Sequence, residues 1–205
     1  MQEDQSVGKE VSRSLELNSG EKQKQDINFK ITHTKNDKVK VASMLPIICN
    51  VNPRSIYNKV EEFHTLVEQE DIDLVFLSES WEREGLPLKD IIRPKDHVVI
   101  SNVSQRSGMG GRPAIVVNNV KYDCQDITNK LVQIPWGVEA VWAILTHKKV
   151  SNRDKIQKIA CCALYSKPHS RKKSALLDHL SNAFNIVSKK YGRGLHFILA
   201  GDTND

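Results

Sequence analysis

The chain has 205 residues, of which 39% are hydrophobic and 27% charged, and its formal net charge is +5. This length and composition fit one soluble globular domain with a substantial core. No apolar run approaches the roughly 18 residues of a membrane-spanning helix, and the N-terminus lacks the apolar stretch of a secretion signal. The four cysteines lack zinc-ligand spacing, so we expect buried free thiols in a reducing, intracellular compartment.

Residues 1–40 differ in composition from the rest of the chain. They hold eight Lys or Arg, seven Asp or Glu and a single aromatic residue, Phe29. Their apolar residues follow no period, so the segment has little apolar surface to offset the entropy lost on ordering. We therefore expect residues 1–40 to be a mostly disordered charged segment and residues 41–205 to form the domain.

The periodic part of the chain begins with a strand, a helix and a second strand. Leu45–Val51 is a short apolar run that is typical of a buried strand. Apolar residues then recur on one helical face over Ile56–Gln69, and Ile72–Leu77 is a second apolar run. This order favours a parallel strand pair joined by a helix, and hence an α/β fold.

Further strand and helix patterns follow. Two apolar runs flank a glycine-rich stretch, which predicts two strands joined by a loop. A helix is predicted to begin at Ser170 or Ser174 and to end at Gly192. The predicted strands are His97–Val103, Ala114–Val117, Val138–Leu145, Lys158–Tyr165 and Leu195–Ala200. Within the fourth of these, Cys161 and Cys162 should face opposite sides of the sheet.

A basic segment runs over Ser151–Leu195. It contains ten Lys or Arg residues, and only Asp154 and Asp178 oppose them. A positive field of this kind suits a polyanion such as nucleic acid. The alternative is a solvated helix face beside a basic loop, and charge alone does not decide between the two.

Polar residues directly follow several of the apolar runs. Asp202 and Asn204 are two residues apart, so in an extended strand their side chains point the same way. Each of these residues alone would be an ordinary turn, loop or core residue, but α/β proteins build their sites at strand ends. Their convergence therefore predicts a functional site made of Asn52, Glu79, Tyr165, Asp202 and Asn204.

Together these stretches resemble the endonuclease/exonuclease/phosphatase superfamily, and most closely the endonuclease domain of LINE-type (non-long-terminal-repeat) retrotransposons. The resemblance implies an α/β fold, a two-sheet α/β sandwich of the DNase I-like type. It covers about residues 45–205 and rests on segments that follow the family's order: Asn52–Ser55 with Asn58 and Lys59, Asp73–Trp81, Arg106–Pro113, Tyr165–Pro168 and Gly201–Asn204.

The resemblance also implies a role for each matched residue. Glu79 would be the main ligand of a single Mg²⁺, with Mn²⁺ as the alternative metal, and Asn52 would support it. Asp202 would orient or deprotonate the attacking water, while Asn204 and Tyr165 would hydrogen-bond the scissile phosphate. Such a site hydrolyses phosphodiesters by activating water and neutralising phosphate charge. The implied partner is DNA, the implied location is the nucleus, and no membrane is involved.

The sequence departs from the family at one important point. The family carries a further Ser-Asp-His motif downstream, and no such motif occurs in residues 1–205. The resemblance therefore implies a sandwich without its last strands, with an exposed edge and exposed apolar surface, and a fragment without activity. In a complete element the nick in DNA would prime reverse transcription.

Two other functions stay open. One is a non-catalytic remnant that binds nucleic acid through the basic segment. The other keeps the superfamily but acts on a phosphorylated small molecule or lipid, and the positive charge argues mildly against it. Target sequence and oligomeric state do not follow from the sequence.

Overall fold

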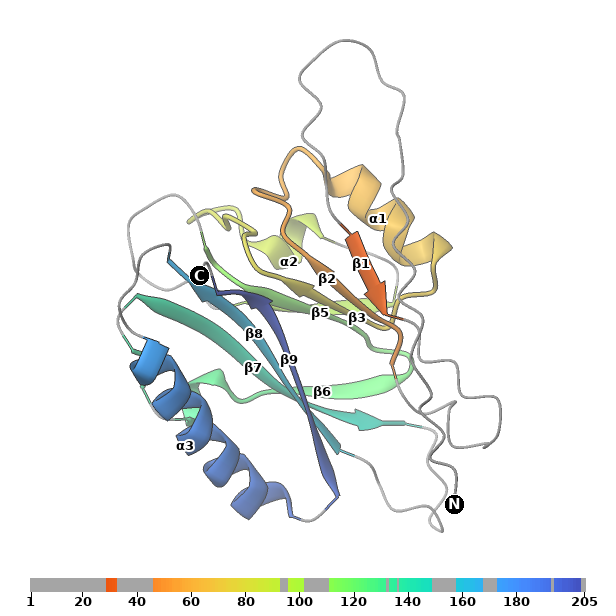
Figure 1. Ribbon diagram of the computed structural model, residues 1–205. Helices are drawn as coiled ribbons and strands as arrows, with labels where there is room; N and C mark the ends of the chain where they lie inside the picture. The colour runs from red at the N-terminus through yellow and green to blue at the C-terminus, as the bar shows by residue number, and fades with distance from the viewer. Residues whose placement is uncertain are drawn as a thin grey trace, which may run out of the picture.

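The computed structural model describes residues 29–32, 46–92, 96–101, 111–131, 133–135, 137–148, 158–167, 173–192 and 194–203. Within these ranges the chain forms two mixed β-sheets packed face to face, with helices on their outer faces (Figure 1). This confirms the predicted two-sheet α/β sandwich. Among the described helices, none is long and apolar enough to cross a membrane.

The first sheet has the strand order β1-β2-β3-β5-β4. Strands β2 and β3 are parallel and joined by α1, as the sequence predicts, while the other neighbours pair antiparallel. The elements are β1 (Phe29–Thr32), β2 (Ile48–Val51), α1 (Val60–Gln69), β3 (Leu74–Leu77), α2 (Leu88–Ile91), β4 (His97–Ser101) and β5 (Ala114–Asn118).

The second sheet has the order β6-β7-β8-β9. Strands β8 and β9 are parallel and joined by α3, whereas β6, β7 and β8 pair antiparallel. The elements are β6 (Tyr122–Asp126), the short 3-10 helix η2 (Thr128–Lys130), β7 (Val138–His147), β8 (Lys158–Ser166), α3 (Lys173–Tyr191) and β9 (Leu195–Asp202).

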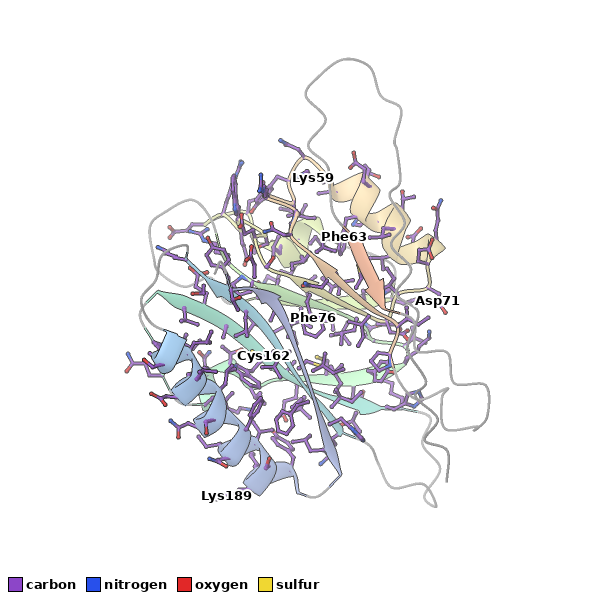
Figure 2. The ribbon with its side chains drawn as sticks, in the orientation of Figure 1. Lys59, Phe63, Asp71, Phe76, Cys162 and Lys189 are labelled. Atoms are coloured by element: carbon purple, nitrogen blue, oxygen red, sulfur yellow. The ribbon has the colours of Figure 1, made fainter. Side chains whose placement is uncertain are left out.

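Three apolar layers hold the sandwich together. Phe76 lies between the two sheets, Phe63 on α1 covers the outer face of the first sheet, and α3 covers the second (Figure 2). Alternation along β8 places Cys161 in the layer between the sheets and Cys162 against α3, as predicted. Burial of each large side chain in these layers stabilises the folded state by about 1.5–3 kcal/mol. The packed layers therefore hold the two sheets, and the ends of their strands, in fixed relative positions.

The cysteines match the prediction of free thiols. None of them forms a disulfide, and Cys49, Cys161 and Cys162 are buried while Cys124 is half-buried. Burial raises the pKa of the Cys49 thiol to about 12, which makes it a poor nucleophile at neutral pH. We therefore assign the cysteines to the core.

Four described elements are absent from the sequence-based expectations: β1, α2, β6 and η2. Strand β6 has only one fully buried residue, Tyr122, so it shows little apolar alternation. Strand β1 pairs with β2 at a sheet edge, inside the segment expected to be mostly disordered. The rest of residues 1–40 lies outside the described residues, so that expectation stays a prediction.

Candidate functional site

Four strands deliver polar side chains to one edge of the sandwich. Because β2 and β3 are parallel, Asn52 and Glu79, which follow their C-terminal ends, emerge at the same edge. On the second sheet the register of the parallel strands β8 and β9 places Tyr165 beside Asp202. Figure 1 shows β8 and β9 side by side in the second sheet.

The side-chain amide of Asn52 joins the two sheets at this edge. Its Nδ2 donates to Glu79 Oε1 at 3.2 Å and to Asp202 Oδ2 at 2.9 Å. Its Oδ1 accepts a hydrogen bond from the backbone N–H of Arg54 at 3.1 Å. One nitrogen therefore holds carboxylates from both sheets within a few ångströms of each other.

The indole of Trp81 is a second donor to Glu79. Trp81 Nε1 donates to Glu79 Oε2 at 3.2 Å, so both carboxylate oxygens accept a hydrogen bond and the carboxylate plane is fixed. Trp81 has a φ of 55°, an uncommon left-handed conformation for a bulky residue. Trp81 has no role predicted from the sequence, although it is the last residue of the segment Asp73–Trp81, which carries the family resemblance.

Gly111 and Arg112 are consecutive residues with positive φ, here called the Gly111–Arg112 turn, and they connect Trp81 to the second sheet. The backbone N–H of Trp81 donates to the Gly111 carbonyl at 3.3 Å, and the N–H of Arg112 donates to Glu139 Oε2 at 2.6 Å. Gly111 has a φ of 72°, and a Cβ there would lie 2.8 Å from both Glu139 Oε2 and the Tyr165 ring. Only glycine fits this position without displacing its neighbours.

Sequence reasoning missed Glu139. It lies inside the predicted strand Val138–Leu145, and no motif distinguishes it there. In the structure the β7–β8 register pairs it with Tyr165, so it faces the site from the strand next to β8. The only sequence feature that could have indicated a role for Glu139 is an acidic residue at the start of an otherwise apolar strand.

Tyr165 lies among three carboxylates. Its side chain is buried, and burial raises the pKa of the phenol. The negative charges of Glu79, Asp202 and Glu139 raise this pKa further because they disfavour the phenolate. Tyr165 is therefore a neutral phenol at pH 7 and can donate a hydrogen bond to an anion.

The donor set fits a hard divalent cation that keeps most of its waters. The described part of the chain contains no cluster of three or more His, Cys, Asp or Glu that would form a complete protein cage. Mg²⁺ is usually held by one or two carboxylates plus water, which Glu79 and Asp202 can supply. Glu79 is half-exposed, so a hydrated ion has access to it.

The loop that follows β2 carries two basic residues close to Asn52, namely Arg54 and Lys59. Arg54 is exposed, and the Nζ of Lys59 donates to the Pro53 carbonyl, so both cations stand next to Asn52. Burial lowers the pKa of Lys59, as does the nearby positive charge of Arg54, while Glu62 raises it. On the second sheet, exposed Lys167 follows Tyr165 by two residues.

The described part of the basic segment divides between two ends of the second sheet. Lys167 follows the end of β8 that carries Tyr165, whereas Lys158, at the first position of β8, lies over the ring of Tyr191 at 5.3 Å. Lys189 lies near the same far end, at the end of α3 (Figure 2). The segment therefore does not form one continuous face among the residues described.

One predicted site residue cannot be placed. Asn204 lies outside the described residues, as do residues 107–110 of the glycine-rich stretch 107–111. The structure brings together the other four predicted residues, Asn52, Glu79, Tyr165 and Asp202. The chemical roles assigned to all five stay predictions.

Comparison with known proteins gives only distant similarities. No protein-family model matches the sequence, and no curated protein matches it. Similar solved structures include a humanized TDP2 from D. rerio, with 14% identity and a TM-score of 0.49, covering 77% of this chain and 66% of that one.

Two other similar structures come from bacteria. One is an endonuclease/exonuclease/phosphatase from Bacteroides vulgatus, with 15% identity, a TM-score of 0.49 and coverage of 76% of this chain and 64% of that one. The other is a 3′ phosphatase, NExo, from Neisseria bound to product DNA hairpin, with 12% identity, a TM-score of 0.47 and coverage of 77% and 57%. The chain thus spans less than two thirds of the length of each of these structures.

Proposed function

We propose that the chain carries a metal-dependent phosphoester-hydrolysing site, and more specifically that of a DNA-nicking endonuclease of a LINE-type retroelement. One observation carries the proposal: Asn52 Nδ2 hydrogen-bonds to both Glu79 and Asp202, beside the phenol of Tyr165. Two like charges held this close favour a bound cation. A neutral phenol next to them suits an incoming phosphate.

Each residue of the site has a separate role in the proposed reaction. Glu79 supplies the main metal-binding carboxylate, which Asn52 and Trp81 keep oriented. Asp202 orients the attacking water, and Tyr165 donates a hydrogen bond to a phosphate oxygen. A bound Mg²⁺ or Mn²⁺ would neutralise phosphate charge and lower the pKa of a coordinated water. We assign Asn204 a second hydrogen bond to the phosphate, on the strength of the resemblance.

DNA is the substrate that the charges around the site favour. Arg54 and Lys59 follow Asn52 on the loop after β2, and Lys167 follows Tyr165 by two residues, so the strand ends that form the site carry positive charge, which suits a polyanionic backbone. An endonuclease that nicks chromosomal DNA acts in the nucleus, and we propose that location. Because residues 1–205 contain no Ser-Asp-His motif, we propose that they bind metal and phosphodiester without turning the substrate over unaided.

The test combines duplex DNA binding with nicking of supercoiled plasmid. We expect wild-type affinity to fall steeply between about 50 and 200 mM salt. We also expect Mn²⁺ to strengthen binding in the wild type and to have no effect in Glu79→Gln. Plasmid should stay supercoiled. Nicking by the wild type that persists in Glu79→Gln would overturn the site assignment.

Two outcomes would favour the other functions. DNA binding that is independent of Mn²⁺ in both proteins would indicate a non-catalytic nucleic-acid-binding remnant. Release of phosphate from inositol phosphates, with a flat salt response toward DNA, would indicate a phosphatase acting on small molecules.

A further inference from the structure

Glu139 is a carboxylate at the site for which the proposed reaction has no use. It occupies the second position of β7, and the β7–β8 register pairs it with Tyr165. Its Oε2 accepts the backbone N–H of Arg112 at 2.6 Å, the short distance of a charge-assisted hydrogen bond. A carboxylate on a central strand thus fixes a turn that belongs to the other sheet.

The turn held by Glu139 contacts the two residues that directly follow Glu79. The Gly111 carbonyl accepts the N–H of Trp81 at 3.3 Å, and the Arg112 carbonyl accepts the hydroxyl of Ser80. Trp81 Nε1 then donates to Glu79 Oε2 at 3.2 Å. Glu139 is therefore connected to Glu79 through a turn and an indole.

The same turn is pressed against Tyr165. A Cβ on Gly111 would lie 2.8 Å from Glu139 Oε2 and 2.8 Å from Tyr165 Cδ1, so turn, carboxylate and ring are closely packed. The charge of Glu139 also helps to raise the pKa of Tyr165, after burial, Glu79 and Asp202. A shift of the Glu139 side chain would therefore displace both the Gly111–Arg112 turn and the Tyr165 phenol.

We propose that Glu139 is a positioning residue that, through the Gly111–Arg112 turn, sets the direction of the Glu79 carboxylate and the place of the Tyr165 phenol. The proposal rests on the proposed function, because it concerns the same site. It assigns Glu139 no contact with metal or phosphate.

Trp81 reports on this connection directly. Its indole N–H gives a separate signal in a ¹H–¹⁵N correlation spectrum, identified by its loss in Trp81→Phe. We expect Glu139→Ala to shift this signal about as far as Glu79→Gln does. Glu139→Gln, which keeps an oxygen acceptor for the Arg112 N–H, should leave it near the wild-type position. The matched control is Asp126→Asn, since Asp126 also accepts a backbone N–H, from Thr128 at 2.8 Å, and should not affect Trp81.

Binding of Tb³⁺, a hard cation excited through Trp81, gives the second readout. Residues that orient a metal ligand typically change affinity by about 10–100-fold when removed, so Glu139→Ala should weaken Tb³⁺ binding at least tenfold. Glu139→Gln should restore most of the affinity. A purely structural role would lower Tm in both variants and would give no such rescue.

The outcomes separate this inference from the proposed function. If the wild type binds no Tb³⁺, the proposed function fails, and the indole signal alone decides the role of Glu139. If the wild type binds Tb³⁺ and Glu139→Ala keeps both the signal and the affinity, the positioning role is wrong. Should Glu139→Ala not fold, Glu139→Asp, whose side chain is one methylene shorter, takes its place with the same expectations.

Discussion

Asn52 and Asp202 are 150 residues apart in the chain, yet Asn52 Nδ2 donates to Asp202 Oδ2 at 2.9 Å. Asn52 follows the first-sheet strand β2, and Asp202 ends β9 of the second sheet. Their hydrogen bond therefore ties the two sheets together where the strands end. The site exists only when the apolar layer between the sheets is packed, so its geometry depends on the fold as a whole.

Replacing Asn52 with aspartate tests the charge balance of the site. Asn52→Asp removes the donor to Glu79 and Asp202 and adds a third negative charge, which should cost about 2 kcal/mol without metal. Mn²⁺ should recover much of that loss. Thermal unfolding with and without Mn²⁺ measures both effects, and Asn58→Asp, on the exposed part of the same loop, is the control. An Asn52→Asp protein as stable as the wild type would contradict the account.

Gly201 sets the approach of β9 to β8 just before Asp202. Its φ is 151°, and a Cβ there would lie 2.0 Å from the Leu164 carbonyl oxygen, which is backbone and cannot move aside cheaply. We expect Gly201→Ala to destabilise the protein by on the order of 3 kcal/mol. Gly194→Ala is the matched control, because Gly194 also has a positive φ but nothing lies within 4 Å of its Cβ position. Equal losses of Tm in the two variants would refute the close approach.

His179 should make stability depend on pH. Burial lowers its pKa, and the backbone of Gln133 offsets this only in part. The unfolded chain therefore takes up the proton first, so stability is complete above about pH 6.5 and declines as pH falls toward the lowered pKa of the folded state. His179→Phe should flatten this decline in Tm, whereas exposed His196→Phe should leave it unchanged. If Tm of His179→Phe still falls with pH as it does in the wild type, another titrating group causes the pH dependence.

Loss of the ion pair between Asp73 and Lys121 should lower the free energy of unfolding far more than loss of a surface pair. Asp73 is buried, and Lys121 Nζ lies 2.7 Å from its Oδ1. Lys121→Met leaves that carboxylate buried without its cation, for which we expect a loss of about 3 kcal/mol. Lys148→Met breaks an exposed pair with Asp123 and should cost less than about 1 kcal/mol. Chemical denaturation gives both values, and similar values would contradict this assignment.

Much of the sandwich follows from local sequence patterns. The apolar periodicity between Leu45 and Leu77 predicts the parallel pair β2 and β3, because only a helix-long connection separates two short apolar runs. The polar residues at those strand ends could be placed at one edge for the same reason. The edge strands β1 and β6 could not be predicted, since the pairing of each is decided by the neighbouring strand, and β6 has only one buried residue to form an apolar pattern.

The support around the predicted site follows from tertiary structure. Glu139 acquires its position from the antiparallel register of β7 and β8, which pairs it with Tyr165. Trp81 donates to Glu79 from a left-handed backbone conformation, which is uncommon for tryptophan and could not be predicted from the sequence. Gly111 is visible as part of a glycine-rich stretch, but its contact with the Tyr165 ring depends on how the sheets pack.

Tb³⁺ luminescence excited through Trp81 tests the claim that Glu79 holds a divalent metal. Because the indole donates to the Glu79 carboxylate, an ion bound there lies close enough to be sensitised. We predict a saturable signal that Mg²⁺ or Mn²⁺ displaces, that Glu79→Gln abolishes and that Glu84→Gln, on the exposed part of the same loop, retains. Luminescence in Glu79→Gln equal to that of the wild type would contradict the claim.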